Sequence, residues 1–337
     1  LEQVCADLPG APCAATVRRY LHPQLSPGAL PTLEKQLNAA LVAQLPQRLS
    51  KQAQEVAFDF HDEPYYGKQP QASGGWVRAR RRQGTTRFYR IATAYVIHRQ
   101  LRCTLAVRFV RPDDTLLTVL KALLRQIRTT QVALATLYLD KGFAEVTIMR
   151  FLTKLGQPAV IACSVRGKTG GTRALCRGRK SYRTPYTFRR RDGVHFTAPL
   201  AVCRVFTTAR RTGRMPRKAK WILFIVIHRP RWNPQRIRDR YQHRFGIESS
   251  YRCARQVRGW TTSPNRAYRF TLLALALLLV NVWVQLQWWC TQVPRRGGRW
   301  LDVKRLRLAR FANLLVRALE DHYGCIREIE VRHAPLT

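Results

Sequence analysis

One long apolar segment limits what this 337-residue chain can fold into. It covers residues 270–289, FTLLALALLLVNVWVQLQWW, and is about as long as a bilayer crossing. Its second half contains Asn281, Gln285 and Gln287, polar side chains that lipid would leave poorly satisfied. A helix that is apolar on all sides can equally be the central helix of a large domain. We therefore expect a buried core helix here and no membrane partner.

The charge of the chain indicates what it binds. Sixty Lys and Arg residues stand against nineteen Asp and Glu, giving a formal net charge of +41, while 46% of the residues are hydrophobic. A folded protein with so large and dispersed a positive charge predicts a polyanionic partner, and nucleic acid first. Aromatic residues are interleaved with the basic ones in segments 87–90 and 183–189, which suits contact with phosphates together with bases or sugars.

The nine cysteines are scattered, without a Cys-x2-Cys pair or matching histidine spacing. This pattern disfavours a zinc site or a disulfide framework and fits a reducing compartment. The chain begins LEQVCADLPG, which has neither the basic nor the apolar region of a signal peptide. We expect a cytoplasmic, nucleoid-associated protein.

The middle of the chain alternates between strand and helix patterns. The predicted elements are strand 55–62, loop 68–87, strands 88–98 and 102–110, a helix capped by Asp113 or Asp114, strand 132–139, helix 144–155 and strand 158–165. This order is the ribonuclease-H-like arrangement, in which the first strand lies centrally beside the fourth. The fold class is therefore predicted as α/β, a ribonuclease-H-like mixed sheet flanked by helices.

Other segments divide the chain into five predicted regions. Strand patterns over 194–207 and 221–228 indicate a β-rich insertion, residues 295–299 a basic linker, and 301–323 a final amphipathic helix. The regions are a small helical N-terminal region (1–54), the first part of the core (55–165), the basic β-rich insertion (166–232), the second part of the core (233–290) and a C-terminal helical region (291–337).

A helix is predicted to begin at Asn233, an N-cap residue followed by Pro234. Steps of three and four place on one of its faces Tyr241, Arg244, Glu248, Tyr251 and Arg255. One carboxylate among guanidiniums and phenols is a poor composition for a core. This face is therefore a candidate functional surface.

The spacing Tyr241-x2-Arg244-x3-Glu248-x6-Arg255 resembles the Tyr-Arg-Glu-Lys signature of bacterial insertion-sequence transposases of the DDE type. The chain departs from it at Arg255, where Lys is usual, and the two side chains contact phosphate with different geometry. The resemblance implies a ribonuclease-H-like catalytic domain that nicks element ends and joins the freed 3′-OH to target DNA. It also implies that Glu248 is the third carboxylate of a two-metal site.

Two aspartates complete the expected triad. Asp59 lies in the first strand and Asp140 ends the fourth, and an acid that terminates an apolar run needs a partner or a metal. Asp62 is the alternative first carboxylate; residues three apart on a strand face opposite sides, so only one of the two can point at the metals. Carboxylate oxygens favour Mg²⁺ or Mn²⁺, and two such ions about 4 Å apart support in-line displacement at phosphorus.

The remaining predicted site residues contact DNA and are basic or phenolic. They are Tyr241, Arg244, Tyr251, Arg252, Arg255, Lys141, Arg80, Arg81, Arg82, Lys168, Arg189 and Arg190. Joining two element ends predicts a homodimer or higher oligomer on DNA. Two alternatives stay open: a ribonuclease-H-like nuclease without strand transfer, and a catalytically silent DNA-binding protein derived from a transposase.

Overall fold

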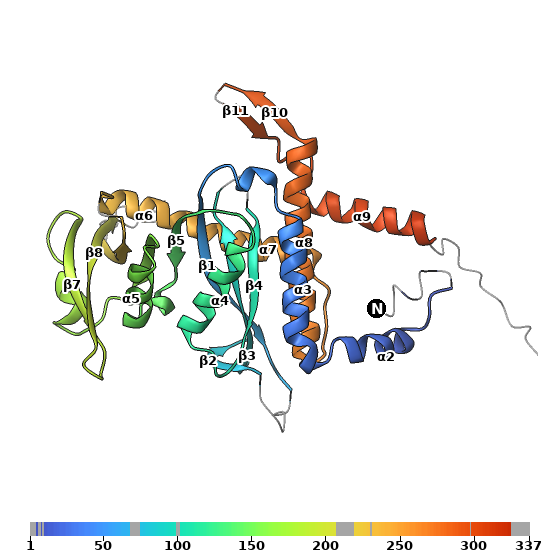
Figure 1. The fold of residues 1–337 in the computed structure, drawn as a ribbon, viewed down its shortest axis with the longest axis horizontal. Coiled ribbons are helices and arrows are strands. Elements are labelled where there is room, and N and C mark those ends of the chain that lie inside the picture. The colour runs from blue at the N-terminus through green and yellow to red at the C-terminus, as the bar shows by residue number, and fades with distance from the viewer. Residues whose placement is uncertain are drawn as a thin grey trace, which may run out of the picture.

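A nine-stranded mixed sheet forms the centre of the molecule, with helices on both of its faces (Figure 1). The computed structural model describes Cys5, Leu8 and residues 10–67, 75–98, 102–206, 219–229, 231–296 and 298–324. The strands follow the order β2-β3-β1-β5-β6-β9-β8-β7, and β4 pairs with β3 outside this path. They are β1 (Gln54–Pro64), β2 (Val77–Arg82), β3 (Thr85–Val96), β4 (Thr104–Val110), β5 (Leu134–Leu139), β6 (Ala159–Cys163), β7 (Tyr182–Arg189), β8 (His195–Phe206) and β9 (Ala219–Ile227).

The helices lie around this sheet and extend beyond it. They are α2 (Ala14–Gln24), α3 (Leu30–Ala43), α4 (Leu116–Arg128), α5 (Val146–Lys154), α6 (Pro234–Gln242), α7 (Gly246–Val257), α8 (Arg266–Cys290) and α9 (Leu308–Tyr323). A separate hairpin, β10 (Gln292–Arg295) and β11 (Gly298–Leu301), follows α8. In Figure 1 the hairpin, α9 and α2 all project from the body of the molecule.

The core topology confirms the predicted ribonuclease-H-like arrangement. β1 pairs antiparallel with β3 and parallel with β5, the strand predicted over 132–139, and β5 pairs parallel with β6. β4 then pairs antiparallel with β3. The first strand therefore lies in the middle of the sheet, beside the predicted fourth strand.

Several local predictions were wrong. β2 forms within the predicted loop 68–87, and β7 within a basic stretch that alternation did not mark as a strand. Both are edge strands, where arginines are tolerated because one side of the ladder faces solvent. β9 pairs antiparallel with β6, so the predicted insertion continues the same sheet.

Three element boundaries also differ from prediction. The cap of α4 is Thr115, whose side chain accepts from the Thr118 amide, whereas Asp114 pairs with Arg108. The predicted basic linker forms the β10–β11 hairpin, and the last helix begins at Leu308.

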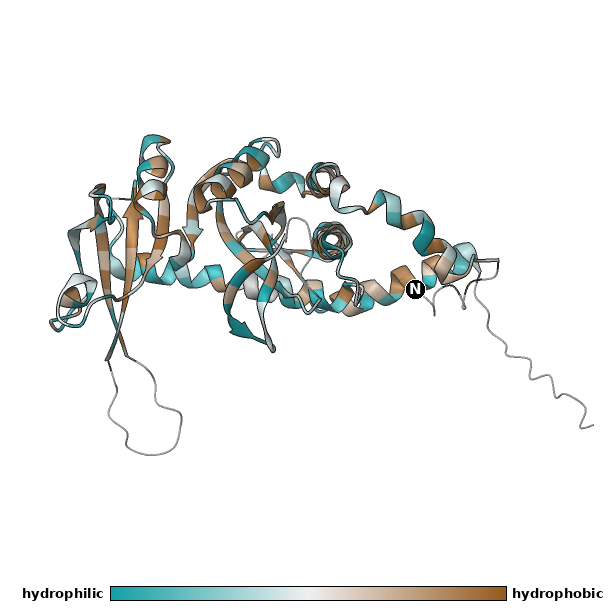
Figure 2. Cartoon of the chain, turned by 90° about the horizontal axis from the view of Figure 1, so that it is seen from below, coloured by the Kyte–Doolittle hydropathy of each residue, from teal (hydrophilic) through white to brown (hydrophobic). Residues whose placement is uncertain are grey.

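The two faces of the sheet carry different clusters. Phe58 packs in the cluster that includes α4 and α5, whereas Ala57, the residue before it, packs in the cluster that includes Ile237 and Tyr241 of α6. Asp59 has the same strand parity as Ala57 and so points to the α6 face. Figure 2 shows hydrophobic residues following the strands and mixed colours along the helices.

The long apolar segment forms α8, which packs against α3, α7 and β4. Asn281 is fully buried, and its amide pairs with both backbone groups of Thr104 at 2.9 Å. Asn38 of α3 does the same for Val107, at 2.9 and 2.8 Å. The two asparagines thus satisfy the open edge of β4 from inside the protein. By length and composition alone α8 is the one described helix that could cross a membrane, and half of its most apolar window is buried.

Candidate active site

The pairing of β1 with β5 brings two predicted carboxylates to one place. Phe58 and Leu139 are partners in this parallel ladder, and Asp59 and Asp140 are the next residues of the two strands. β5 ends at Leu139, and the chain turns into the 3₁₀ helix η3 (Lys141–Phe143). The side chain of Asp59 is 20% exposed and that of Asp140 is 40% exposed. Both acids are therefore open enough to meet a ligand.

A buried guanidinium lies between these two acids. Nη2 of Arg244 donates to Oδ1 of Asp59 at 2.8 Å, and Nη1 lies 4.0 Å from Oδ1 of Asp140. Burial alone would lower the pKa of Arg244, but Tyr241, Asp59 and Asp140 outweigh it and raise the pKa. Arg244 is charged at any working pH, so the position between the two carboxylates is one where a positive charge is stable.

The local helix geometry explains this placement. Asn233 caps α6 as predicted, its side chain accepting from the Arg236 amide at 2.8 Å, with Pro234 at the first helical position. The predicted helix is not continuous, because it tightens into the 3₁₀ turn η5 (His243–Phe245) before α7 starts. Arg244 lies in this turn, and its Nε is buried without a hydrogen-bond partner among the described residues. The guanidinium at the site therefore has one buried N–H group without a hydrogen-bond acceptor among the described residues.

The donor set fits a divalent metal ion. Two carboxylates converge on a position that already holds positive charge, and carboxylate oxygens are the ligands Mg²⁺ and Mn²⁺ prefer. Glu248 lies in the first turn of α7, and its side chain falls outside the described part of the structure. Within the described residues no group of three or more His, Cys, Asp or Glu side chains could hold a metal. Asp59 and Asp140 are therefore the two predicted carboxylates that the described structure brings together.

Asp62, the alternative first carboxylate, has other partners. Arg90 contacts it through Nε at 2.7 Å and Nη2 at 2.9 Å, and Arg82 also donates to it. Burial alone would raise the pKa of Asp62, but the two arginines outweigh it and lower the pKa. Its charge is already neutralised, so the geometry favours Asp59 over Asp62.

The phenol of Tyr241 does not fit the predicted contact with phosphate. The residue is 5% exposed, and its hydroxyl donates to the Leu139 carbonyl at 3.0 Å. Burial raises its pKa. Tyr241 therefore fixes the end of β5, one residue before Asp140.

Tyr251 also points inward. Its hydroxyl hydrogen-bonds with Thr93, and its ring packs on His61 with the ring centroids 4.9 Å apart. Burial raises its pKa. This phenol supports the sheet beside Asp59, and because the residue is half-buried its contact with DNA stays a prediction.

The basic residues predicted to contact DNA are on the surface, with one exception. The exposed ones are Arg80, Arg81, Arg82, Lys141, Lys168, Arg189, Arg190, Arg252 and Arg255. Arg82 also pairs with Asp62, and Arg190 pairs with Asp192 at 3.0 Å. Arg244 is the exception, because it is buried against the acids, and its contact with phosphate stays a prediction.

A cavity of about 750 Å³ lies beside the continuation of β1, and the sequence did not indicate it. Arg255, Arg258 and Arg269 line it, and Trp260, which is 90% exposed, stands at its edge. Glu63 at its base is buried and paired with Arg258. The only sequence signal was a tryptophan in the polar segment that follows the predicted Glu248 helix.

Comparison with known proteins identifies the family. The sequence matches the transposase DDE domain over residues 54–282. The chain belongs to this transposase family.

Among solved structures, the chain is similar to the piggyBac transposase synaptic complex with hairpin DNA, with a TM-score of 0.48 and 11% sequence identity. That alignment covers 83% of this chain and 59% of the piggyBac chain, so this chain spans less than two thirds of that protein. No curated protein matches the sequence.

Proposed function

We propose that this protein is the transposase of a bacterial or archaeal insertion sequence, which cuts the element ends and joins the 3′-OH to target DNA. The observation that carries the proposal is the parallel β1–β5 pair, with Asp59 and Asp140 at its end and Arg244 between them. Water would cleave a phosphodiester at the element end. The freed 3′-OH would then attack a phosphodiester of the target, which releases one strand end for each bond made.

Asp59, Asp140 and Glu248 are the residues that we assign to metal binding. When bound, two Mg²⁺ or Mn²⁺ ions would supply Lewis-acid stabilisation of the charge at phosphorus. Arg244 holds the two aspartates together before loading, because it is their shared counter-ion. Tyr241 keeps Asp140 in place through the Leu139 carbonyl.

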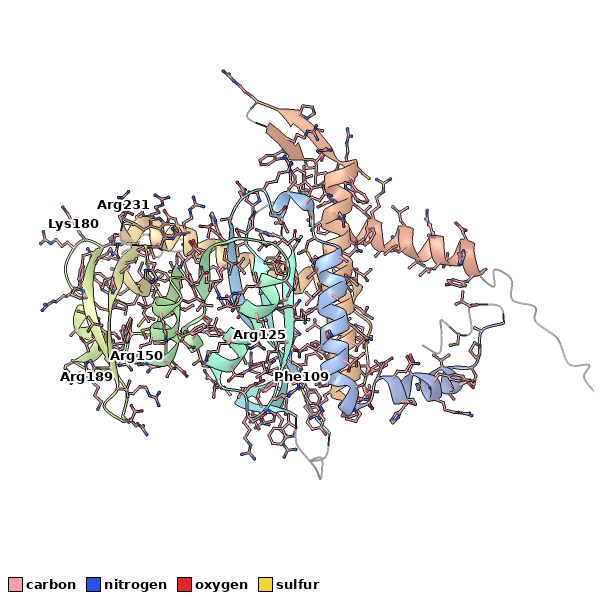
Figure 3. The ribbon with its side chains drawn as sticks, viewed as in Figure 1. Phe109, Arg125, Arg150, Lys180, Arg189 and Arg231 are labelled. Atoms are coloured by element: carbon pink, nitrogen blue, oxygen red, sulfur yellow. The ribbon has the colours of Figure 1, made fainter. Side chains whose placement is uncertain are left out.

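The surface charge supports DNA as substrate. Arg252 and Arg255 are exposed on α7, the helix that carries Glu248, and would contact phosphates close to the cleaved bond. Figure 3 shows Lys180, Arg189 and Arg231 at the outer end of the molecule around β7 and α6, where a longer duplex would be held. Contacts of this kind add affinity and salt dependence without reading sequence. We place the protein in the cytoplasm, as a homodimer or higher oligomer on DNA.

The test uses a labelled duplex that carries the candidate element end, a second target duplex and Mg²⁺. We expect the wild-type protein to nick the first duplex and join it to the second. Asp140→Asn and Glu248→Gln should bind the same duplex with unchanged affinity and leave it intact. Arg125→Gln, which removes an exposed charge of α4 that is not among the predicted DNA contacts, is the matched surface control and should retain activity.

The assay separates the proposal from its alternatives. Nicking without joined product would indicate a nuclease, and binding without nicking would indicate a silent DNA-binding protein. Equal activity of Asp140→Asn and wild type would refute the assignment of the site.

A further inference from the structure

The β10–β11 hairpin is a structural unit that the catalytic site does not use. It forms a two-stranded sheet of its own, apart from the nine-stranded sheet (Figure 1). Its register pairs Gln292 with Leu301 and Arg295 with Gly298. An isolated hairpin of this size is marginally stable in water, so its base must be held by other contacts.

The base of the hairpin is anchored in the core. Leu301 is 2% exposed and lies in the same cluster as Trp288 and Val284 of α8. The Asp302 amide donates to the Thr291 carbonyl at 2.9 Å, which closes the base of the hairpin. The hairpin is therefore fixed at this base, and its strands project from the body of the molecule (Figure 3).

The projecting part is basic. The sequence from Gln292 to Leu301, QVPRRGGRWL, contains three arginines and no acid. Arg296 and Arg299 are exposed, and Arg299 is oriented along the ribbon by a hydrogen bond of 3.0 Å to Gln292. Exposed arginines do not contribute to a hydrophobic core, and their guanidinium groups suit contact with a phosphate or with the edge of a base.

The dimensions of the hairpin match a DNA groove. Four residues per strand, at about 3.4 Å each, give a ribbon about 13 Å long. The major groove of B-DNA is about 12 Å wide and about 8.5 Å deep, and it admits a two-stranded ribbon. The hairpin is therefore long enough for its tip to reach the floor of the groove while its base stays in the protein.

We propose that the β10–β11 hairpin is a DNA-binding arm that enters the major groove of a duplex with Arg296 and Arg299. This inference rests on the proposed function, because it adds a contact to a DNA substrate already assigned. It is tested by binding alone, without cleavage.

The experiment compares two double variants that remove the same charge. Arg296→Ala/Arg299→Ala changes the hairpin, and Arg125→Ala/Arg128→Ala removes two exposed arginines from α4, far from the hairpin in Figure 3. Binding of the full chain to the labelled element-end duplex is measured between 50 and 200 mM salt. Losing two phosphate contacts lowers the slope of log K against log salt by about 1.8.

We expect the hairpin variant to lose at least about tenfold in affinity with this change of slope, and the α4 variant to stay within about twofold of wild type. Dimethyl sulfate reacts with guanine N7 in the major groove. Some guanines should be protected from it by wild type and by the α4 variant, and should stay reactive in the presence of the hairpin variant.

Equal losses of affinity in both variants, or unchanged protection, would overturn the inference. So would a change in the sedimentation of the DNA-free hairpin variant, which would make the hairpin a subunit contact. Wild type that binds DNA but fails to cut it would refute the proposed function and leave the hairpin result standing.

Discussion

Replacing Arg244 by methionine tests the electrostatics of the site directly. The change keeps most of the side-chain length and removes the charge that Asp59 and Asp140 share. Without metal, the two carboxylates then face each other without their counter-ion. We expect Arg244→Met to be less stable than wild type in EDTA, and the difference to shrink when Mn²⁺ is added, because the ion replaces the lost charge.

The magnitude follows from the exposure of the partners. Removing one member of a fully buried ion pair costs about 3–5 kcal/mol. Asp59 is 20% exposed and Asp140, 4.0 Å from the guanidinium, is 40% exposed, so both can regain water. We therefore expect a loss of about 2 kcal/mol, close to the contribution of one hydrogen bond to a charged group. For a chain of this size this corresponds to a melting temperature lower by about 3 °C.

The assay is calorimetric unfolding in EDTA and in Mn²⁺, together with titration calorimetry of Mn²⁺ binding. Arg240→Met is the matched control, because Arg240 is a surface arginine one turn away that pairs with Glu55 at 3.3 Å. It should lose less than about 1 kcal/mol, with no dependence on metal. Arg244→Met should also bind Mn²⁺ more tightly than wild type, since no arginine has to be displaced. Equal stability losses in the two variants, or a gap that Mn²⁺ leaves unchanged, would refute the argument.

Three further changes probe the structure around the site. Asp62→Asn should lower the free energy of unfolding by about 1–2 kcal/mol at pH 7. Arg90 and Arg82 lower the pKa of Asp62, so its contribution to stability is complete above about pH 4 and is lost as the pH falls through the folded pKa. In urea unfolding, the difference from wild type should therefore close below about pH 4. Tyr241→Phe should lower Mn²⁺ affinity and the cleavage rate about tenfold, a loss of about 1.4 kcal/mol, while DNA affinity is unchanged. The reason is that the Leu139 carbonyl loses its hydrogen bond and the position of Asp140 is held less firmly. Weaker DNA binding instead would show that Tyr241 contacts DNA. Asn281→Leu should cost about 3 kcal/mol in urea unfolding, because both backbone groups of Thr104 lose their partner, and a loss under 1 kcal/mol would show that water replaces the amide.

The sequence predicted the core of the fold because the core strands carry clear hydrophobic patterns. Alternation around Phe58 marked β1 and placed Asp59 on the opposite face, and the apolar run before Asp140 marked β5. The order of strands and helices then sufficed for the ribonuclease-H-like arrangement. β2 and β7 escaped this reasoning because arginines and polar residues at a sheet edge erase the alternation on which it depends.

The chemistry of the helix face was harder to predict than its position. The spacing of Tyr241, Arg244 and Tyr251 on one face was correct in outline, but spacing alone does not say whether a face is turned toward solvent or toward the sheet. The helix face packs on the strands, so the phenol of Tyr241 is buried against the backbone of β5, and that of the half-buried Tyr251 hydrogen-bonds with Thr93. Trp260 drew no prediction, because an isolated tryptophan in a polar segment gives no periodic signal of its 90% exposure.

The position of Arg244 links the charge of the protein to its chemistry. A chain with a net charge of +41 has to keep acids available for metal while arginines compete for them. Asp62 and Glu63 each form a close ion pair with an arginine, and breaking such a pair costs free energy. At the two aspartates one guanidinium serves two carboxylates. Among the residues that the structure describes, which exclude the side chain of Glu248, it makes one short carboxylate contact and its Nε has no hydrogen-bond partner, so it is the most easily displaced of these arginines. We therefore expect divalent ions to select Asp59 and Asp140 over the neighbouring acids because those are the acids that the arginines hold least firmly.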